Sequence, residues 1–356
     1  MLFAAACGAQ PTVQTGKDRI LIGAIVGSDA AVGTSVTRGI QVALREYNEK
    51  KDSIFEAELR QFDSKGTPEG AKQAADALVK TDHVVGVIGP LSGAEVVSAA
   101  GSFEPAQMPF LVPSVSSNSI PQPGWKGFRR MIANDSREGQ LLGTLAYRRT
   151  DGPIDIFNDG QAGAPIADAA KAVLEGKKRT VTRAEVLPAK LDLKAFSAGV
   201  MSAAPAGIIY CGAAKKGLDV VASLRKAGYK GPLFMSHEAR ATPADKALTG
   251  LISDQPQADP ADQAVADFSA TFQERFTVAP TPYAVEAYEA ALMLLEAVQE
   301  VAPKPDDVSS FFRLNPSFLG DSKSYDYSES GEVPKAPVWV YESQNGAWRL
   351  TGSFSG

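Results

Sequence analysis

The amino-acid sequence predicts an α/β fold made of two lobes, each with a parallel sheet covered by helices. Apolar, strand-like runs alternate with stretches that carry apolar residues at three- and four-residue spacing. This alternation is typical of parallel sheets with helices on both faces. The chain has 356 residues, of which 44% are hydrophobic and 22% are charged. That is an ordinary globular balance, and the length suggests about two domains. There are also more strand-like runs than one open sheet usually uses.

Seven apolar runs are expected to form strands. They cover residues 19–26, 55–62, 84–89, 109–115, 153–159, 206–212 and 231–238. Helical patterns lie between them at 34–50, 67–80 and 215–228. The first of these has an apolar face made of Val36, Ile40, Ala43, Leu44 and Tyr47. Because strand and helix follow each other repeatedly, successive strands should run parallel.

A break divides this series into two lobes. After the strand at 109–115 comes a loop, then a short strand at 128–132 and a helix at 133–147. Asp135 or Ser136 is the expected N-cap of that helix. A second series of strand–helix units follows, so we expect the lobes to meet near Asn134 and Asp135.

The last third of the chain changes character. Long amphipathic helices are expected at 259–276 and 282–301, and a strand–turn–strand segment with Ser-Gly and Asn-Gly turns at 323–350. The domain division that we predict is residues 19–134 and 258–335 for lobe 1, and residues 135–257 and 336–356 for lobe 2.

Residues 1–18 are expected to be a signal remnant and a tether. A short apolar stretch with small residues precedes Cys7 and resembles the end of a bacterial lipoprotein signal, in which that cysteine carries the lipid. The polar segment after it contains proline and glycine, as tethers do. The alternative is an unstructured end with an incidental cysteine. The other cysteine, Cys211, lies in a strand-like run and is expected to be buried.

Several classes of function are disfavoured. A net charge of −5 without a long basic run argues against nucleic acid as a partner. No apolar run approaches the roughly 18 to 20 residues of a membrane span. His83 and His237 stand at unrelated positions, which argues against a histidine-based metal site. No nucleotide loop, dinucleotide fingerprint or nucleophile elbow is present. We therefore expect neither an enzyme nor a bound cofactor or metal.

Residues after the strands carry the information about ligands, because open parallel sheets bind ligands beyond the carboxyl ends of their strands. Ser92 can cap a helix that begins near Gly93, where free backbone N–H groups and the helix dipole favour an anion. Ser116, after the adjacent strand, can supply another hydroxyl and amide. The alternative is that both serines only cap helices and form turns. Two such positions in one lobe favour the anion.

Glu238 ends the strand-like run at 231–238 in the second lobe. A carboxylate that faced the space between the lobes would pair with an ammonium group. The alternative is a capping or surface glutamate. His237 beside it is given no role.

Four stretches together resemble the substrate-binding proteins of branched-chain amino-acid ABC transporters, which have the type I periplasmic-binding fold of two Rossmann-like lobes joined by a hinge. They are residues 19–48, 84–117, 128–140, and 282–298 followed by a hairpin at 325–333. The similarity extends over almost all of the chain from Arg19 onward, and 84–117 is its most specific part.

The resemblance implies roles for the residues after the strands. A ligand carboxylate would be held near Ser92 and Gly93 and at Ser116. The ammonium group would be held by the backbone carbonyl of Ser114 and by the carboxylate of Glu238. These positions agree with those derived from the strand ends.

The loops of this chain also depart from the family. Members that bind aliphatic amino acids commonly offer aromatic side chains, and the loop at 27–33 has none. The segment after Phe157 lacks a tyrosine. The pocket is therefore expected to be wider or more polar than that of a leucine binder, with Asp159 and Gln161 near the ligand.

The function predicted on this basis is capture of a small amino acid or related carboxylate outside the cytoplasm, and its delivery to the membrane permease of an ABC importer. The protein is expected to be a monomer. One alternative is a ligand-sensing module on the same fold. The other is an α/β enzyme that acts on a small carboxylate, for which the sequence offers no nucleophile and base pair.

Overall fold

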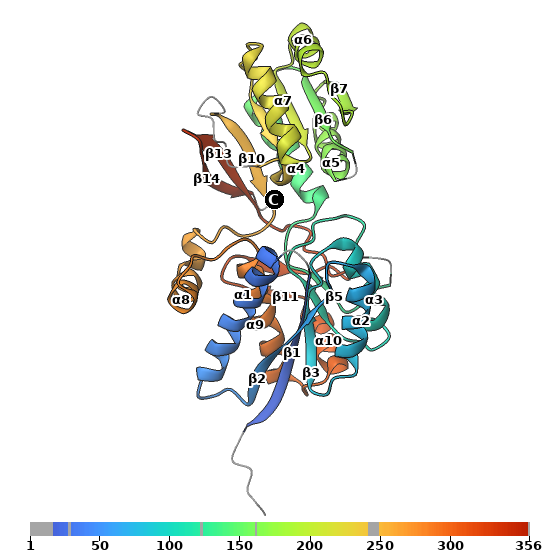
Figure 1. The fold of residues 1–356 in the computed structure, drawn as a ribbon, viewed down its shortest axis with the longest axis vertical. Helices are drawn as coiled ribbons and strands as arrows, with labels where there is room; N and C mark the ends of the chain where they lie inside the picture. Colours follow the sequence, from blue (N-terminus) through green and yellow to red (C-terminus); the bar gives the residue numbers. More distant parts are fainter. Residues whose placement is uncertain (1–16, 28–29, 122–123, 161, 241–248, 355–356) are drawn as a thin grey trace, which may run out of the picture.

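The computed structural model describes residues 17–27, 30–121, 124–160, 162–240 and 249–354. Figure 1 shows two lobes, one above the other along the longest axis of the molecule. Each lobe has its own sheet with helices on both faces, which confirms the predicted fold class. Cys7 and Gln161 lie outside the described residues. Within the described part, no helix is long and apolar enough to span a membrane.

Lobe 1 is built on a five-stranded parallel sheet in the order β2-β1-β3-β4-β5. The strands are β1 (Asp18–Val26), β2 (Phe55–Asp63), β3 (Val84–Ile88), β4 (Phe110–Val112) and β5 (Phe128–Arg130). The helices that follow the first three strands are α1 (Ala30–Glu49), α2 (Pro68–Val79) and α3 (Gly93–Phe103).

Strand β1 is covered on both faces. Ile20, Ile22 and Ala24 belong to the apolar cluster that contains the α1 residues. Leu21 and Ile25 point the other way, into the cluster formed with α2 and α3. This division follows from the two-residue repeat of a strand, and it explains why a nearly continuous apolar run is needed here.

Lobe 2 contains a seven-stranded sheet in the order β14-β13-β10-β9-β8-β6-β7. Its parallel strands are β6 (Ile154–Asn158), β7 (Val181–Val186), β8 (Gly207–Cys211), β9 (Leu233–Met235) and β10 (Leu251–Gln255), and the antiparallel ones are β13 (Val338–Gln344) and β14 (Ala347–Phe354). The helices are α4 (Asp135–Arg149), α5 (Gly163–Gly176), α6 (Leu193–Ala203) and α7 (Ala214–Lys226). Cys211 is buried, as predicted.

Both parallel sheets have the same order along the chain: second, first, third, fourth, fifth strand. In a sheet of this order the connections leave in opposite directions at the first and third strands, and ligands bind beyond the strand ends at that point. The relevant loops therefore follow β1 and β3 in lobe 1, and β6 and β8 in lobe 2.

The chain passes between the lobes three times. It enters lobe 2 after β5, returns to lobe 1 after β10, and re-enters lobe 2 before β13. The elements between these passages are η3 (Gln263–Val265), α8 (Ala266–Phe276), α9 (Ala284–Glu300), α10 (Pro305–Leu314), β11 (Ser317–Leu319) and β12 (Ser324–Asp326).

The three passages are hydrogen-bonded to one another. Ala133 N–H donates to the carbonyl of Pro256 at 3.2 Å. Arg137 Nε donates to the carbonyl of Ala336 at 3.0 Å. The passages therefore form one connection between the lobes. The exact residues at which the lobes divide stay a prediction from the sequence.

Two local details differ from the expectations. The N-cap of α4 is Asn134, whose side chain accepts from the N–H of Arg137, because Asp135 and Ser136 are already helical. The Ser330-Gly331 pair lies in a turn closed by Ser328 and Glu332, but no strands pair across it, since β12 pairs with the preceding β11. The predicted hairpin at 325–333 is therefore wrong. The Asn345-Gly346 turn joins β13 to β14 as expected.

The contact between α1 and α9 provides a test of the packing. A Cβ atom on Gly39 in α1 would lie 2.2 Å from the carbonyl oxygen of Ala284. Gly39→Ala should therefore lower the free energy of unfolding by about 1–3 kcal/mol or more. Gly101→Ala in α3 is the control, because no heavy atom lies within 4 Å of a Cβ there. It should stabilise by about 0.5–1 kcal/mol. Urea unfolding of both variants would measure this, and equal curves would contradict the packing.

Candidate functional site

The start of α3 carries unused backbone donors. Ser92 is its N-cap with an extended backbone, but its side chain accepts no capping hydrogen bond. Its hydroxyl instead donates to Glu95 Oε2 at 2.6 Å. The spacing is that of a capping box, with the hydroxyl in the opposite role. Among the described residues, no group accepts from the N–H of Gly93 or Ala94. Free N–H groups and the helix dipole make this a site for an anion.

Glu95 fixes the position of Ser92. Its side chain is buried, with 2% of the residue exposed, and its other oxygen accepts from the hydroxyl of Ser64 after β2. A Cβ on Gly27, after β1, would lie 3.2 Å from this carboxylate. Glu95 therefore lies among the loops that follow the first three strands. The free donors at the start of α3 are thus backbone N–H groups rather than the Ser92 hydroxyl.

The loop after β4 lies beside this helix start. Ser114 donates its hydroxyl to the carbonyl of Leu91 at 3.1 Å. A Cβ on Gly93 would contact Val115 at 3.7 Å and Ser117 at 3.9 Å. The structure therefore brings Ser92, Gly93 and the 114–117 segment together on lobe 1.

In lobe 2, Asp159 joins the ends of β6 and β8. Its Oδ2 accepts from the N–H of Ala213 at 2.6 Å, at the start of α7. A Cβ on Gly212 would lie 2.2 Å from the Asp159 carboxyl carbon, and Gly212 has a φ of 142°, so only glycine fits between them. The Asp159 carboxylate thus holds the start of α7 from a half-buried position.

Glu238 lies in the short helix η1 (His237–Ala239) after β9 and is half-buried. Its carboxylate accepts no hydrogen bond from the described residues. Burial raises the pKa of the Glu238 carboxyl above its ordinary value, and His237 opposes that rise. Three nearby carboxylates raise this pKa further; they belong to Glu138, Asp135 and Asp159. A cation placed beside Glu238 would relieve this repulsion.

A buried cluster behind Glu238 was missed by the sequence analysis. Glu138, on the first turn of α4, accepts from the backbone N–H of His237 at 3.0 Å and contacts its Nδ1 at 2.7 Å. The two carboxylate oxygens of Asp254, in β10, are buried, and neither has a hydrogen-bond partner among the described residues. Ligand atoms from the three residues lie within 4.8 Å of one another. The prediction that gave His237 no role therefore overlooked its contact with Glu138, 99 positions away.

In this cluster, the pKa values of Asp254 and His237 are both shifted above their ordinary values. Burial, and then the charge of Glu138, raise the pKa of Asp254 well above its ordinary value. Burial alone would lower the pKa of His237, but the carboxylate of Glu138 raises it. Burial and the charge of Glu138 thus favour the neutral form of Asp254, and the Glu138 carboxylate favours the charged form of His237. Two carboxylates and an imidazole at these distances are also a donor set that could coordinate a divalent metal.

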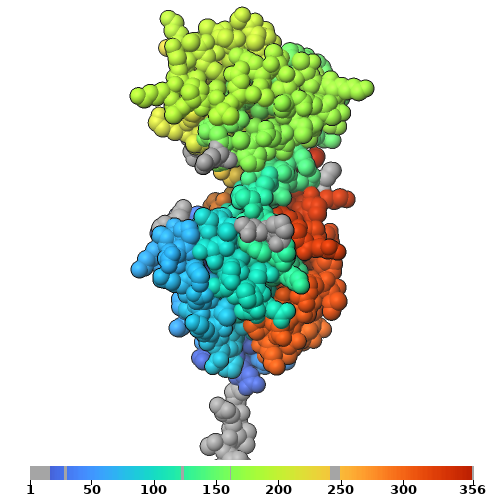
Figure 2. Space-filling model, turned by 90° about the vertical axis from the view of Figure 1, so that its right-hand side faces the viewer, coloured from blue at the N-terminus to red at the C-terminus, as the bar shows by residue number. Residues whose placement is uncertain are grey.

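The first turn of α4 lies between the two candidate half-sites. Asp135 N–H donates to the carbonyl of Ser116 at 2.9 Å, and Asn118 contacts Ser136 at 2.9 Å. On the same turn, Glu138 accepts from the backbone N–H of His237, the neighbour of Glu238. The loop after β4 in lobe 1 and the loop after β9 in lobe 2 therefore face the same region, where the molecule narrows between the lobes (Figure 2).

Comparisons with known proteins identify the family of this chain. The model of the family described as periplasmic binding protein matches residues 21–346. The chain belongs to this family. This confirms the family resemblance and the predicted role as a substrate-binding protein of ABC importers, and it implies a location outside the cytoplasm.

Individual relatives of this periplasmic binding protein are distant. It is 25% identical over 345 residues to a leucine-, isoleucine-, valine-, threonine- and alanine-binding protein of Pseudomonas aeruginosa, covering 92% of this chain and 90% of the relative. An ABC transporter substrate-binding protein of Desulfitobacterium hafniense, solved with leucine, has a TM-score of 0.81 at 20% identity, covering 94% and 100% of the two chains. One from R. palustris, solved with 4-hydroxybenzoate, has a TM-score of 0.76 at 17% identity, covering 95% and 97%.

The protonation of Asp254 gives a pH test. Its raised pKa means that the native state holds a proton that the unfolded chain releases above its ordinary pKa of 3.8. The stability conferred by that proton is complete below pH 3.8 and is lost as the pH rises, by about 1.4 kcal/mol per pH unit. Asp254→Asn keeps the shape without the proton. Its stability relative to the natural protein should therefore increase as the pH rises above 4.

The matched control for this test is Asp155→Asn. Asp155 is equally buried but is paired with Arg183, so its loss should lower the free energy of unfolding at pH 7.5. Chemical unfolding at several pH values would measure both variants. Parallel pH profiles for the natural protein and Asp254→Asn would show that Asp254 is ionised in the folded state.

Proposed function

We propose that this periplasmic binding protein captures a small amino acid or a related carboxylate between its lobes and delivers it to the permease of an ABC importer. The observation that carries the proposal is a pair of complementary groups for which the described residues supply no hydrogen-bond partner. Lobe 1 offers the N–H groups of Gly93 and Ala94, and lobe 2 offers the carboxylate of Glu238. A zwitterion has the matching charges at its two ends.

Each end of the ligand has a defined partner in this proposal. The ligand carboxylate accepts from the N–H groups at the start of α3, with Ser92 and Ser116 beside it. The ligand ammonium donates to Glu238 and to the carbonyl of Ser114. These are charge-assisted hydrogen bonds, which strengthen when closure of the lobes excludes water.

The amino group distinguishes the candidate ligands. The printed names of relatives include binders of aliphatic amino acids and of 4-hydroxybenzoate, and the chemistry that these ligands share is the carboxylate. Glu238 favours the amino acids, because a benzoate would place no cation beside it. We infer that Asp159 and Gln161, which follow β6 in the sequence, contact the ligand and influence its side-chain preference.

The order of events follows from the two lobes. The ligand first binds the helix start on lobe 1, and rotation about the three chain passages then brings Glu238 over it. The closed form, which the ligand stabilises by binding it better than the open form, is the one that the permease recognises. We place the hinge at the predicted boundaries near residues 134, 257 and 335. The protein acts as a monomer, attached to the membrane through a lipid on Cys7.

Calorimetric titration with matched ligand pairs tests this function. The pairs are leucine with 4-methylpentanoate and alanine with propionate, which differ by the amino group. Glu238→Gln should weaken amino-acid binding about 30-fold or more, because it removes a charge-assisted hydrogen bond from an enclosed site. It should leave the matched carboxylates unaffected. The control is Glu185→Gln, an exposed carboxylate on β7 in the same lobe.

Two results would contradict the proposal. One is the absence of heat and of any thermal shift with every amino acid and carboxylate tested. The other is equal loss of binding by Glu238→Gln for both members of a pair, which would mean that Glu238 does not meet the amino group. Recovery of a chemically altered ligand would instead support the enzyme alternative.

A further inference from the structure

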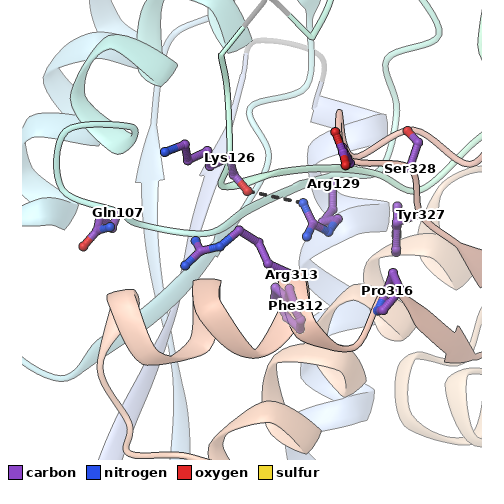
Figure 3. Close-up of a pocket in the computed structure, with 9 residues that line it drawn as sticks. Gln107, Lys126, Arg129, Phe312, Arg313, Pro316, Tyr327 and Ser328 are labelled. Carbon is purple, nitrogen blue, oxygen red and sulfur yellow. Dashed lines mark hydrogen bonds between the residues drawn. The ribbon is translucent and has the colours of Figure 1, made fainter.

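A second hollow lies on lobe 1, on the side away from the ligand loops. Its volume is about 600 Å³, and its lining includes Lys126, Arg129, Phe312, Arg313 and Tyr327. Figure 3 shows that these side chains come from β5 and the segment leading into it, from α10, and from the chain after β12. Lys126 precedes β5, so the hollow opens near the amino ends of the strands, whereas Ser92 and Ser116 follow their carboxyl ends.

Arg129 is the buried cation of this hollow. The residue is 4% exposed. Its Nη1 donates to the carbonyls of Lys126 at 3.3 Å and Phe128 at 2.7 Å. Its Nε is buried without a partner, and Nη2 donates to none of the described groups. The rings of Phe312 and Tyr327 lie 5.9 and 5.3 Å from the guanidinium carbon. Arg129 thus has two aromatic neighbours but no carboxylate partner among the described residues.

The next residue shows what a paired arginine looks like in this lobe. Arg130 is fully buried and forms an ion pair with Glu332 at 2.8 Å. No ion pair of the described residues includes Arg129. A buried acid such as Asp254 can become neutral by taking up a proton, but a guanidinium cannot lose its proton at accessible pH. An anion that is not part of the described chain would therefore compensate the buried charge of Arg129.

The rest of the hollow adds positive charge. Lys126 and Arg313 are exposed, and neither is in an ion pair of the described residues. Arg313 donates only to the hydroxyls of Ser309 and Ser310. Burial, and also the charge of Arg313, lower the pKa of Arg129.

Two carboxylates lie near this cationic group. Glu104 is occupied by the backbone N–H groups of Lys126 and Gly127, and Glu329 lies exposed in the lining. The three cations therefore outnumber the one carboxylate, Glu329, that has no partner.

We propose that this hollow is a second binding site, for the phosphate or carboxylate group of a small solute. The Nε and Nη2 groups lie on one edge of the guanidinium, and this edge matches two oxygens of an oxyanion. Lys126 and Arg313 supply further charge at the mouth, and the rings of Phe312 and Tyr327 form apolar walls. The site is separate from the space between the lobes, so it is filled independently of the transported ligand.

Thermal unfolding of the whole protein tests this site. Sodium phosphate or sodium acetate is titrated against sodium chloride at constant ionic strength and pH 7.5. A specific site gives a rise in Tm that follows a binding curve and reaches about 2 °C at ten times the dissociation constant. Arg313→Gln and Lys126→Gln should each move the midpoint of that curve about tenfold higher in anion concentration. Lys51→Gln, an exposed cation elsewhere on lobe 1, should leave it unchanged.

Arg129→Met should abolish the saturable rise, and if that variant does not fold, the two exposed variants carry the test. A curve with phosphate alone identifies a phosphate site, and a curve with acetate alone identifies a carboxylate site. Glu238→Gln should leave the curve unchanged, which separates this site from the one between the lobes. No rise, or a linear rise of equal slope in every variant, would overturn the proposal.

Discussion

The hydrogen bonds between Glu138 and His237 determine where the candidate cation partner lies. Glu138 is held inside lobe 2 by the first turn of α4, and it accepts from both the backbone N–H and the ring of His237. This contact fixes the chain directly after β9, and no described residue donates a hydrogen bond to the adjacent carboxylate of Glu238. Since the same turn of α4 also binds the carbonyl of Ser116, one helix start relates the acidic half-site of lobe 2 to the anion half-site of lobe 1.

Arg130 has the corresponding role on the other side of the hinge. Its guanidinium donates to the carbonyls of Val115, Ser117 and Ile120, and it pairs with Glu332 near the third chain passage. Glu332 also accepts from the side chain of Asn134 at 3.1 Å. The loop that carries Ser114 and Ser116 is therefore attached to two of the three passages. A rotation of the lobes about these passages would move Glu238 while leaving the anion half-site intact, which is the property that sequential capture requires.

Periodicity made the fold predictable, whereas the electrostatics of the site depend on contacts between distant residues. The alternation of strands and helices could be predicted because strands such as β1 and β8 are buried on both faces and are therefore continuous apolar runs. Strand β7 was missed because it is largely exposed, and β10 because it contains the polar Asp254 and Gln255. The position of Ser92 at a helix start was predictable from local sequence, and the Ser92–Glu95 spacing could also have revealed its partner. No local sequence pattern links Glu138, His237 and Asp254, or shows that Arg129 has no ion-pair partner among the described residues. These relations arise only when the chain has folded.

The central claim is that a zwitterion is held by backbone N–H groups of lobe 1 and by Glu238 of lobe 2. A crystal structure of the protein with a bound amino acid tests it most directly. The account predicts a closed form in which the ligand carboxylate lies within hydrogen-bond distance of the N–H groups of Gly93 and Ala94. In the same structure the ligand ammonium contacts the carboxylate of Glu238. An amino acid bound elsewhere, or one whose ammonium group is held by other residues while Glu238 faces solvent, would contradict the account.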